Sequence, residues 1–598
     1  MPDVIGRVGG WWKAAAGCAI CASLVAGLIQ DARYWVWDRT VGYILPAQAT
    51  FDTCLSRGVA ALQRPEGALY QVIVTVPLGD QGQVAFRQIE TSLTRAYGET
   101  QAAAIRVGAL DCEPLKPTAG DSADRLATAE ARADALLAGT GADVVLWGEV
   151  FADGKTMELR FAHPRDPQAV VGTDRAAVYE AGAITLDLNF GHDIGALIAA
   201  RALDRTLDIA GSDRLDQGAV AAQILTLLSP LVAARPPGIS DANYADVLFS
   251  EGVAAATAAA ANADGAALLA AADRLAASEA LYPPEAVAKR DLARIFATLH
   301  RVNAASMLPV PEALTLLVDA IAAFDAVTPR VEALFGPRLA QYLYSNIGLS
   351  ITLAGARLPE PQRSLWLQEG AARLRQAAVA LPEAALLLQF ATGIHARAAV
   401  SDDQTALALN VEATAANNRA LAALPEGDRG MIWLRAATLK GEMLLDRVSA
   451  GTEPDRAATL DQAIAVLTEA VTVATGTAAA ADRARAEGAL GWALVGRSFG
   501  TEDATEATDL VARAETSLRA ALTVYRPDAS PQLYGWALSG LAFTRVACAQ
   551  TRGCGDPDAE RAKAVARFAE AAEGYRVAGD DDEAAHMLAM SQKYGSSP

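Results

Sequence analysis

The 598-residue sequence is poor in the side chains that most often carry chemistry. It has five histidines, and none lies at metal-ligand spacing from a second histidine or a cysteine. It also lacks the Gly-x-x-x-x-Gly-Lys-Ser/Thr phosphate loop and the Gly-x-Ser-x-Gly nucleophile elbow. Because no cluster of acids, bases and nucleophiles stands out, we expect a protein that is not an enzyme, with no catalytic, cofactor or metal site.

Positive charge is scarce as well. Lys and Arg number 51 against 70 Asp and Glu, which gives a net charge of -19, and no basic run interrupts this balance. Such a surface repels phosphate backbones, so nucleic acid is not an expected partner. Hydrophobic residues make up 52% of the chain, a composition that indicates folded protein. A chain of this length is too long to fold around one hydrophobic core, so we expect several domains or a repeat array.

One long apolar run lies near the amino terminus. Residues 14–29 carry no charge and are almost wholly apolar. A helix reaching from the tryptophan pair before this run to the pair after it would span about 35 Å, so both pairs would lie at bilayer interfaces. We therefore expect residues 1–50 to hold a cytoplasmic tail, one transmembrane anchor and an interfacial segment. The four interfacial residues are Trp11, Trp12, Trp35 and Trp37.

The charges that flank the anchor predict its orientation. Arg7 and Lys13 precede the run, and the positive-inside rule keeps them in the cytoplasm, although Arg33 and Arg39 follow it and weaken the bias. We expect a single-pass protein of the inner membrane with the bulk of its chain in the periplasm. Two alternatives stay open: a cleaved signal peptide and a buried amphipathic helix.

Cysteine placement bears on the same question. Two of the six cysteines lie inside the apolar run, where small core residues are expected. Cys548 and Cys554 flank a short Ala-Gln-Thr-Arg-Gly loop that could close as a disulfide in an oxidising compartment. The alternative is two unpaired thiols near a helix end.

Residues 51–212 have the pattern of a small α/β domain. Apolar and β-branched runs at 72–76, 105–110 and 142–150 alternate with helical stretches. Asp-Gly at 153–154 then predicts a hairpin to a further strand. This order predicts one sheet with helices packed on it.

Two segments of this domain call for a functional reading. The Gly-Thr-Gly-Ala-Asp segment at 139–143, the Val-Val-Leu-Trp-Gly-Glu-Val run after it and the hairpin resemble the amino-terminal α/β domain of TolB/CsgG-type envelope proteins. The resemblance implies a module that docks onto other envelope proteins and performs no chemistry. The Leu-Gly-Asp-Gln-Gly loop at 78–82 is a candidate anion cradle, but it lacks a lysine, so a plain strand-to-helix turn is favoured.

A pattern of the form Ala-x-x-x-Leu-x-x-Ala recurs through residues 213–598. Eight copies, some of them loose, begin 46 to 51 residues apart. A fixed period of this size indicates a stack of like units, whereas the alternative is chance recurrence in an alanine-rich helical chain. The residues expected to pack between helices are Ala271, Leu275, Ala320, Phe324, Ala463, Leu467, Ala470, Ala514, Leu518, Ala521, Ala564, Phe568 and Ala571.

Proline follows several copies of this pattern, as at Pro283, Pro329 and Pro382, and marks the ends of units. Pattern and prolines together make residues 215–595 resemble the tetratricopeptide repeat (TPR) family. The resemblance implies stacked helical hairpins with a protein or peptide partner in their groove. The period is longer than the 34 residues of that family, so longer hairpins are expected.

These features predict a mainly α fold: an α-solenoid of long TPR-like hairpins, a small amino-terminal α/β domain and one transmembrane helix. We expect a membrane-anchored, non-enzymatic scaffold or adaptor of the bacterial cell envelope that contacts the lipid bilayer through its amino-terminal helix. The alternative is a cytoplasm-facing sensor, or a signalling or defence effector, whose array controls the membrane helix.

Overall fold

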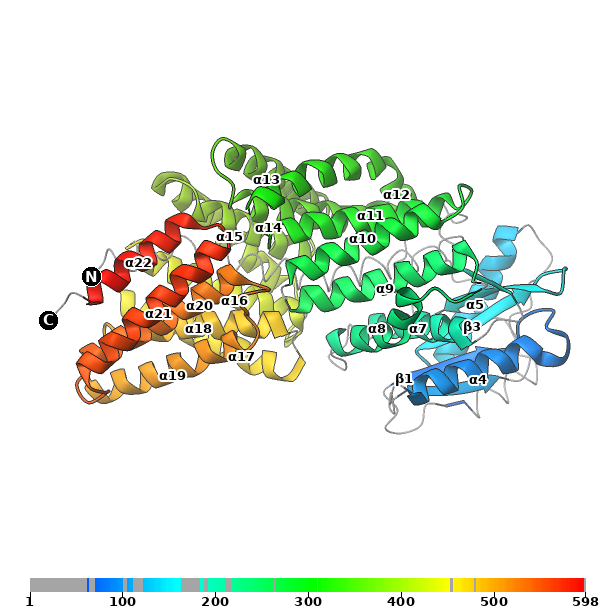
Figure 1. Cartoon of the computed structure of the whole chain (residues 1–598), viewed down its shortest axis with the longest axis horizontal. Coiled ribbons are helices and arrows are strands. Elements are labelled where there is room, and N and C mark those ends of the chain that lie inside the picture. The colour runs from blue at the N-terminus through cyan, green and yellow to red at the C-terminus, as the bar shows by residue number, and fades with distance from the viewer. Residues whose placement is uncertain are drawn as a thin grey trace.

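The chain is mainly helical, with a small α/β region at the amino-terminal end of its described part (Figure 1). The predicted anchor and its four tryptophans lie outside the described residues. Among the helices that are described, none is long and apolar enough to cross a membrane. The computed structural model describes residues 62–63, 70–99, 105–110, 122–162, 183–187, 192–209, 217–237, 239–262, 264–308, 310–451, 455–477 and 480–595.

The α/β region is built on one five-stranded sheet with the order β2-β1-β3-β4-β5. Strands β2, β1 and β3 run parallel, and β4 and β5 continue the sheet antiparallel. Asp153 shapes the predicted hairpin, since its carboxylate accepts hydrogen bonds from the backbone N–H groups of Lys155 and Thr156. The strands are β1 (Tyr70–Thr75), β2 (Ile105–Leu110), β3 (Val144–Val150), β4 (Thr156–Ala162) and β5 (Ile184–Asp187).

Helices cover both faces of this sheet. Alternate residues of a strand point to opposite faces, so Val72 and Val74 pack beneath α4 (Val84–Glu99) and α7 (His192–Ile209), whereas Ile73 packs beneath α5 (Ser122–Thr140). The core below α4 and α7 also takes in α8 (Gln217–Ala233) and part of α9 (Asp241–Ala261). The α/β region and the first helices of the array therefore share one core.

From α8 onward the described chain is a succession of helices, each packed against the next. Every second helix also contacts the one two places further on, from α12 through α14, α16 and α18 to α20, so these helices form an inner layer. The remaining helices are α10 (Gly265–Leu281), α11 (Val287–Ala305), α12 (Val310–Gly355), α13 (Gln362–Ala380), α14 (Ala384–Ala399), α15 (Asp403–Ala422), α16 (Met431–Ser449), α17 (Arg456–Thr477), α18 (Ala480–Ser498), α19 (Ala504–Leu522), α20 (Pro531–Gln550), α21 (Pro557–Val577) and α22 (Asp581–Gly595).

Helix α12 is folded as a hairpin. The rings of Phe324 and Tyr344 lie 6.1 Å apart, although 20 residues of straight helix would separate them by about 30 Å. The chain therefore reverses between them, in a stretch that contains Pro329 and Pro337. Helical residues continue past Pro329, so this proline lies close to a unit boundary without ending the helix at that residue.

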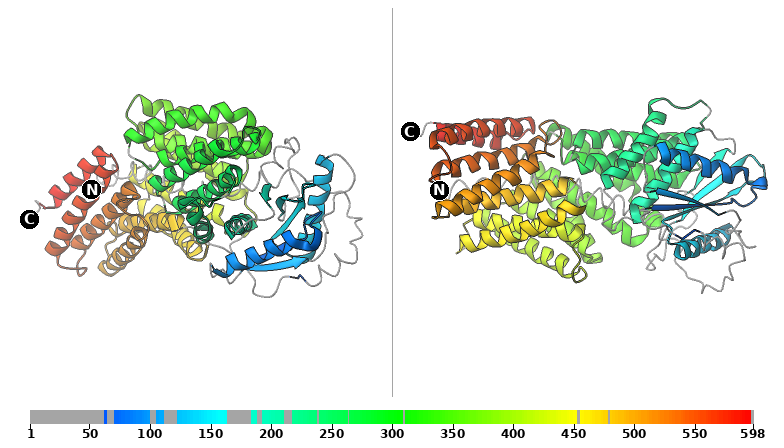
Figure 2. Two further views of the ribbon diagram at one scale, coloured as in Figure 1. Left: turned by 45° about the vertical axis from the view of Figure 1, so that its right-hand side comes forward. Right: turned by 90° about the horizontal axis from the view of Figure 1, so that it is seen from below.

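The array curls, so that helices far apart along the chain come into contact (Figure 2). Helix α9 contacts α18, and Ala260 of α9 belongs to the same hydrophobic cluster as residues of α16 to α22. Further along, the Arg357 side chain after α12 donates hydrogen bonds to the backbone oxygens of Ser306 and Ala578, at 2.8 and 3.3 Å. Helices in the first half of the array thus contact helices in its second half.

Candidate functional site

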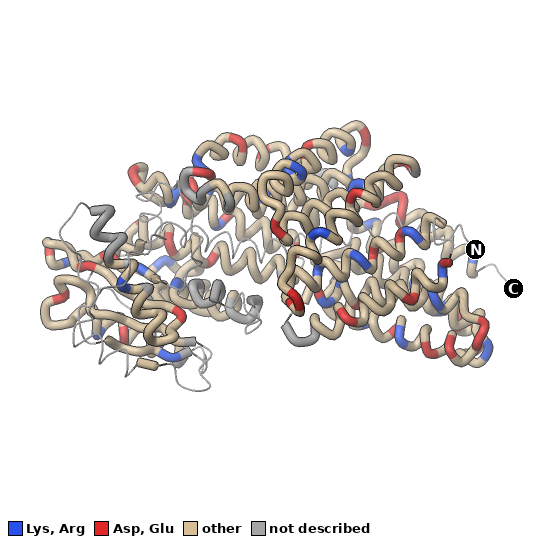
Figure 3. Tube along the Cα trace, turned by 180° about the vertical axis from the view of Figure 1, so that it is seen from behind, with Lys and Arg blue, Asp and Glu red and all other residues tan. Residues whose placement is uncertain are grey.

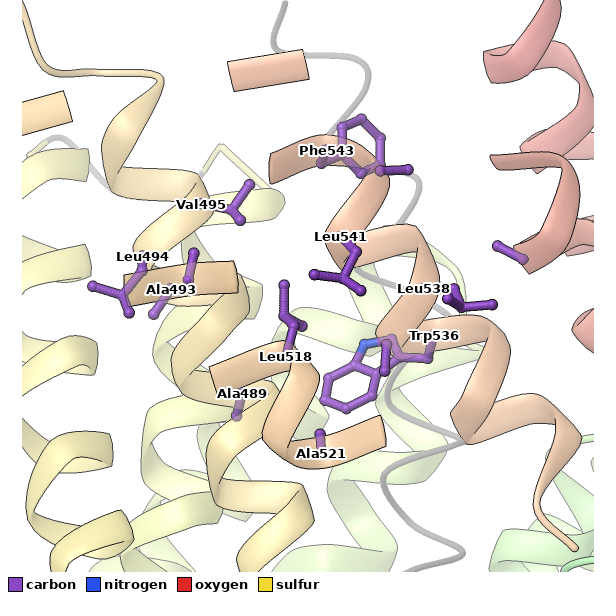
Figure 4. Close-up of a cluster of buried hydrophobic side chains, with 14 of the residues drawn as sticks. Ala489, Ala493, Leu494, Val495, Leu518, Ala521, Trp536, Leu538, Leu541 and Phe543 are labelled. Atoms are coloured by element: carbon purple, nitrogen blue, oxygen red, sulfur yellow. The ribbon is translucent and has the colours of Figure 1, made fainter. Parts of the chain in front are cut away.

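The recurring alanine and leucine residues lie at the contacts between helices. All thirteen residues singled out for packing are at most 3% exposed. Leu518 and Ala521 of α19, for example, lie in one buried cluster with Ala489 and Ala493 of α18 and with Trp536 of α20 (Figure 4). The copies occupy α10, the first half of α12, α17, α19 and α21.

Four leucines at the large position of the pattern each face a glycine on a neighbouring helix. A Cβ atom added to Gly441 of α16 would lie 2.5 Å from Cγ of Leu467, closer than real carbon contacts allow. The glycines therefore form the holes that the leucines fill, which lets paired helices approach closely. The pairs are Gly252–Leu275, Gly393–Leu374, Gly441–Leu467 and Gly491–Leu518.

Buried polar contacts connect successive inner helices. Arg435 of α16 forms two 3.0 Å hydrogen bonds to Asp482 of α18, and Glu442 of α16 pairs with Arg485 of α18. Earlier contacts of the same kind join Asn303 with Ser350, Asn346 with Gln389, and His395 with Asp446.

These buried polar contacts, which we call the polar ladder, join positions about one repeat apart. Arg435 and Asp482 are 47 residues apart and Glu442 and Arg485 are 43 apart, close to the sequence period. Because both partners of these pairs are buried, each holds the register of two hairpins and would be costly to break. We therefore assign the polar ladder a role in packing the helices together.

The inner layer does not form an open concave face. In α14, 13 of the 16 residues are buried, and the inner helices α16, α18 and α20 are similar. These inner helices leave few exposed residues on the face where the TPR resemblance implied a partner groove. A binding surface must therefore be sought elsewhere on the described array.

A cleft opens where the first helices of the array lie near α18 and the segment after α19. Its volume is about 740 Å³, which lies within the range of ligand sites. One wall comes from α8, α9 and α10, and the other from the start of α18 and the segment after α19. The cleft is lined by Leu225, Ala255, Ala258, Ala259, Asn262, Asp264, Ala267, Ala270, Arg274, Ala480, Arg483, Thr523, Val524 and Arg526.

Three arginines set the electrostatics of this cleft. Arg274 is paired at 2.9 Å with Glu251, whose side chain is only 3% exposed. Burial raises the pKa of Glu251, and the neighbouring guanidinium opposes that rise. Arg526 lies 3.8 Å from both Asp264 and Asp528, beyond hydrogen-bonding distance.

Arg483 forms no short ion pair with any residue that the structure describes, but its guanidinium interacts electrostatically with Glu487, one turn further along α18. The exposed side chain of Arg483 lies on the first turn and a half of α18. Elsewhere on the trace, Lys and Arg are scattered among Asp and Glu (Figure 3). The cleft therefore brings basic groups together in a chain that is acidic as a whole.

The other candidate sites are occupied by structural contacts. In the 78–82 loop, the Asp80 carboxylate accepts hydrogen bonds from the backbone N–H groups of Ala85 and Phe86, so the start of α4 already carries an anionic cap. The sulfurs of Cys548 and Cys554 are joined as a disulfide. Within the described ranges, no group of His, Cys, Asp and Glu residues could hold a metal ion.

No protein-family model matches the chain, and no curated protein is significantly similar to it. The likeness to the TPR and TolB/CsgG families therefore remains a resemblance, and a proposal about function has to rest on the geometry of the fold.

Sequence patterns did not point to the cleft arginines. Arg274, Arg483 and Arg526 are separated by more than forty residues at each step and belong to no shared motif. They meet only because the array closes on itself. A basic cluster of this kind leaves no run of Lys and Arg in the sequence.

Proposed function

We propose that the protein is a membrane-anchored, non-enzymatic scaffold of the bacterial cell envelope that binds a protein partner through its helical array. The observation that carries the proposal is the cleft between helices α8 to α10 and the α18–α19 part of the array, a recess lined by three arginines in an otherwise tightly packed array. Stacked helical hairpins are common binding platforms, and clefts between packed elements are common ligand sites.

The remaining features support binding more than catalysis. Two buried charge pairs that join inner helices, Arg435 with Asp482 and Glu442 with Arg485, are satisfied by each other. Paired groups of this kind hold helices together and are not poised for proton transfer. The anchor and the envelope location come from the apolar run and its flanking charges.

The test of this proposal is partner capture by the full chain and by a chain that ends at residue 262. The shortened chain keeps α8 and α9, which complete the core beneath the sheet. Chemical cross-linking in cells should yield a protein adduct with the full chain and lose it with the shortened one. Capture of the same partner by both chains would place binding on the part that the shortened chain keeps, the α/β region with α8 and α9, and refute the proposal.

Compartment separates this proposal from a cytoplasm-facing sensor. A reporter enzyme that is active only outside the cytoplasm, fused after Pro598, should be active if the array is exported. Activity of a cytoplasm-only reporter at the same position would instead favour the sensor, in which ligand binding to the array acts on the membrane helix.

A further inference from the structure

We propose that the cleft binds an acidic, partly aliphatic segment of a polypeptide, with Arg483 and Arg526 holding its carboxylates. This inference rests on the proposed function, since it specifies the chemistry of the partner. It assigns the binding surface to the cleft between helices α8 to α10 and the α18–α19 part of the array, and not to a concave groove.

Charge complementarity is the first support. The chain carries nineteen more acidic than basic residues, yet the cleft lining contains three arginines and a single acidic residue, Asp264. That carboxylate is partly committed, because it accepts a 2.9 Å hydrogen bond from the backbone N–H of Ala267 at the start of α10. Arg274 is engaged by Glu251, which leaves two guanidinium groups for a ligand.

The guanidinium groups of Arg483 and Arg526 can bind a carboxylate without first breaking a short hydrogen bond. Arg483 interacts electrostatically with Glu487, one turn further along α18, but forms no short ion pair with a described residue, and the two acidic neighbours of Arg526 each lie 3.8 Å away. A carboxylate that reaches either guanidinium can therefore form charge-assisted hydrogen bonds without first breaking a short one. The Arg526 side chain is 54% exposed, so it also remains partly solvated and free to reorient.

The apolar part of the lining favours a peptide over a small inorganic anion. Six alanines line the cleft, so a ligand can approach the helix backbones closely. Leu225 and Val524 add larger apolar surface. Burial of aliphatic side chains there would contribute roughly 25 cal/mol per Å² of apolar area, a gain that phosphate cannot make.

The position of the cleft gives binding a consequence. Its walls come from parts of the array that are far apart along the chain, with Asp264 on one side and Arg526 on the other, and the contact between these two side chains is a long one of 3.8 Å. A ligand that touches both walls binds the closed array better than an open one. It therefore stabilises closure by mass action.

The test uses the purified full chain and a short fluorescent peptide in which Glu alternates with Leu and Ala. Binding is followed by fluorescence anisotropy at low and high salt. A copy with Gln in place of Glu tests the carboxylates, and inorganic phosphate and succinate, added as competitors, test for a site that takes any small anion. The cleft variants are Arg483→Glu and Arg526→Glu, and the matched control is Arg513→Glu, another exposed arginine that does not line the cleft.

We expect the acidic peptide to bind, and the Gln peptide and each cleft variant to weaken binding about tenfold or more, because each removes a charge-assisted contact. The control variant should bind as the native chain does, and high salt should weaken binding. Three outcomes would overturn the inference: no binding by the native chain, equal weakening by the control, or displacement by phosphate or succinate at concentrations similar to the peptide's.

The two proposals fail separately. If the cleft variants lose no affinity while cross-linking still requires the array, the partner binds another surface and only the acidic-segment inference is wrong. If the chain that ends at residue 262 captures the same partner, the scaffold proposal itself is refuted, whatever the peptide does.

Discussion

Helices α12 and α13 approach each other so closely at Gly370 that a side chain added there would meet the backbone of α12, near Gly348. Gly370→Ala is therefore the sharpest test of the packing between helices. An added Cβ at Gly370 would lie 2.7 Å from the carbonyl oxygen of Gly348 and 2.8 Å from the backbone nitrogen of Thr352. Neither atom can turn away as a side chain can. The two helices would have to separate to admit a single methyl group.

The magnitude follows from two opposing effects. Alanine is favoured over glycine in a helix interior by about 1 kcal/mol. Overpacking costs about 1–3 kcal/mol, and backbone contact puts this position at the upper end of that range. We therefore expect Gly370→Ala to lower the free energy of unfolding by about 2 kcal/mol.

Urea unfolding followed by far-UV circular dichroism, together with hydrogen exchange of the amides of α12 and α13, measures this loss. Gly496→Ala is the matched control, because its new Cβ would meet only the flexible end of Leu460, at 3.2 Å. The control should be neutral or slightly stabilising. A Gly370→Ala protein at least as stable as the native chain, with unchanged exchange in both helices, would refute the reasoning.

Three further predictions concern buried charge and the disulfide. Burial raises the pKa of Asp580 to about 6 and that of Glu583 to about 8. The folded chain thus holds these protons more tightly, and their stabilising contribution is lost as pH rises from about 4 to about 8, by up to about 1.4 kcal/mol per pH unit for each group. Urea midpoints across this range should fall, and Glu583→Gln should flatten the fall. Asp482→Ala leaves a buried arginine unpaired and should cost about 3–5 kcal/mol in the same assay. Peptide mapping without reductant should recover the linked Cys548 and Cys554 from an oxidising compartment, and Cys548→Ser should cost about 2 kcal/mol.

The helical pairing could be predicted from the sequence because it is encoded locally. Residues such as Ala463 and Leu467 recur on one face of a helix, and Pro283 and Pro382 lie just after the ends of α10 and α13. The sheet was predictable for the same reason, since its β-branched runs and the Asp-Gly turn are short-range signals.

The curvature of the array could not be predicted in this way. The curvature depends on small rotations that accumulate from one hairpin to the next. These rotations are set by packing residues that differ between copies of the repeat, such as Gly370. A groove was therefore expected where the described structure has a covered inner layer. The cleft arises from the same curvature, which brings Arg274 beside Arg526 across more than 200 residues.

The most direct test of a partner-binding cleft is site-specific photo-cross-linking in cells. A photoreactive residue replaces Thr523, which lines the cleft, and in a second variant it replaces Arg513, which does not. We expect a covalent adduct with a protein partner from position 523 and none from position 513. No adduct from position 523, or the same adduct from both positions, would contradict the assignment of the cleft as the binding surface.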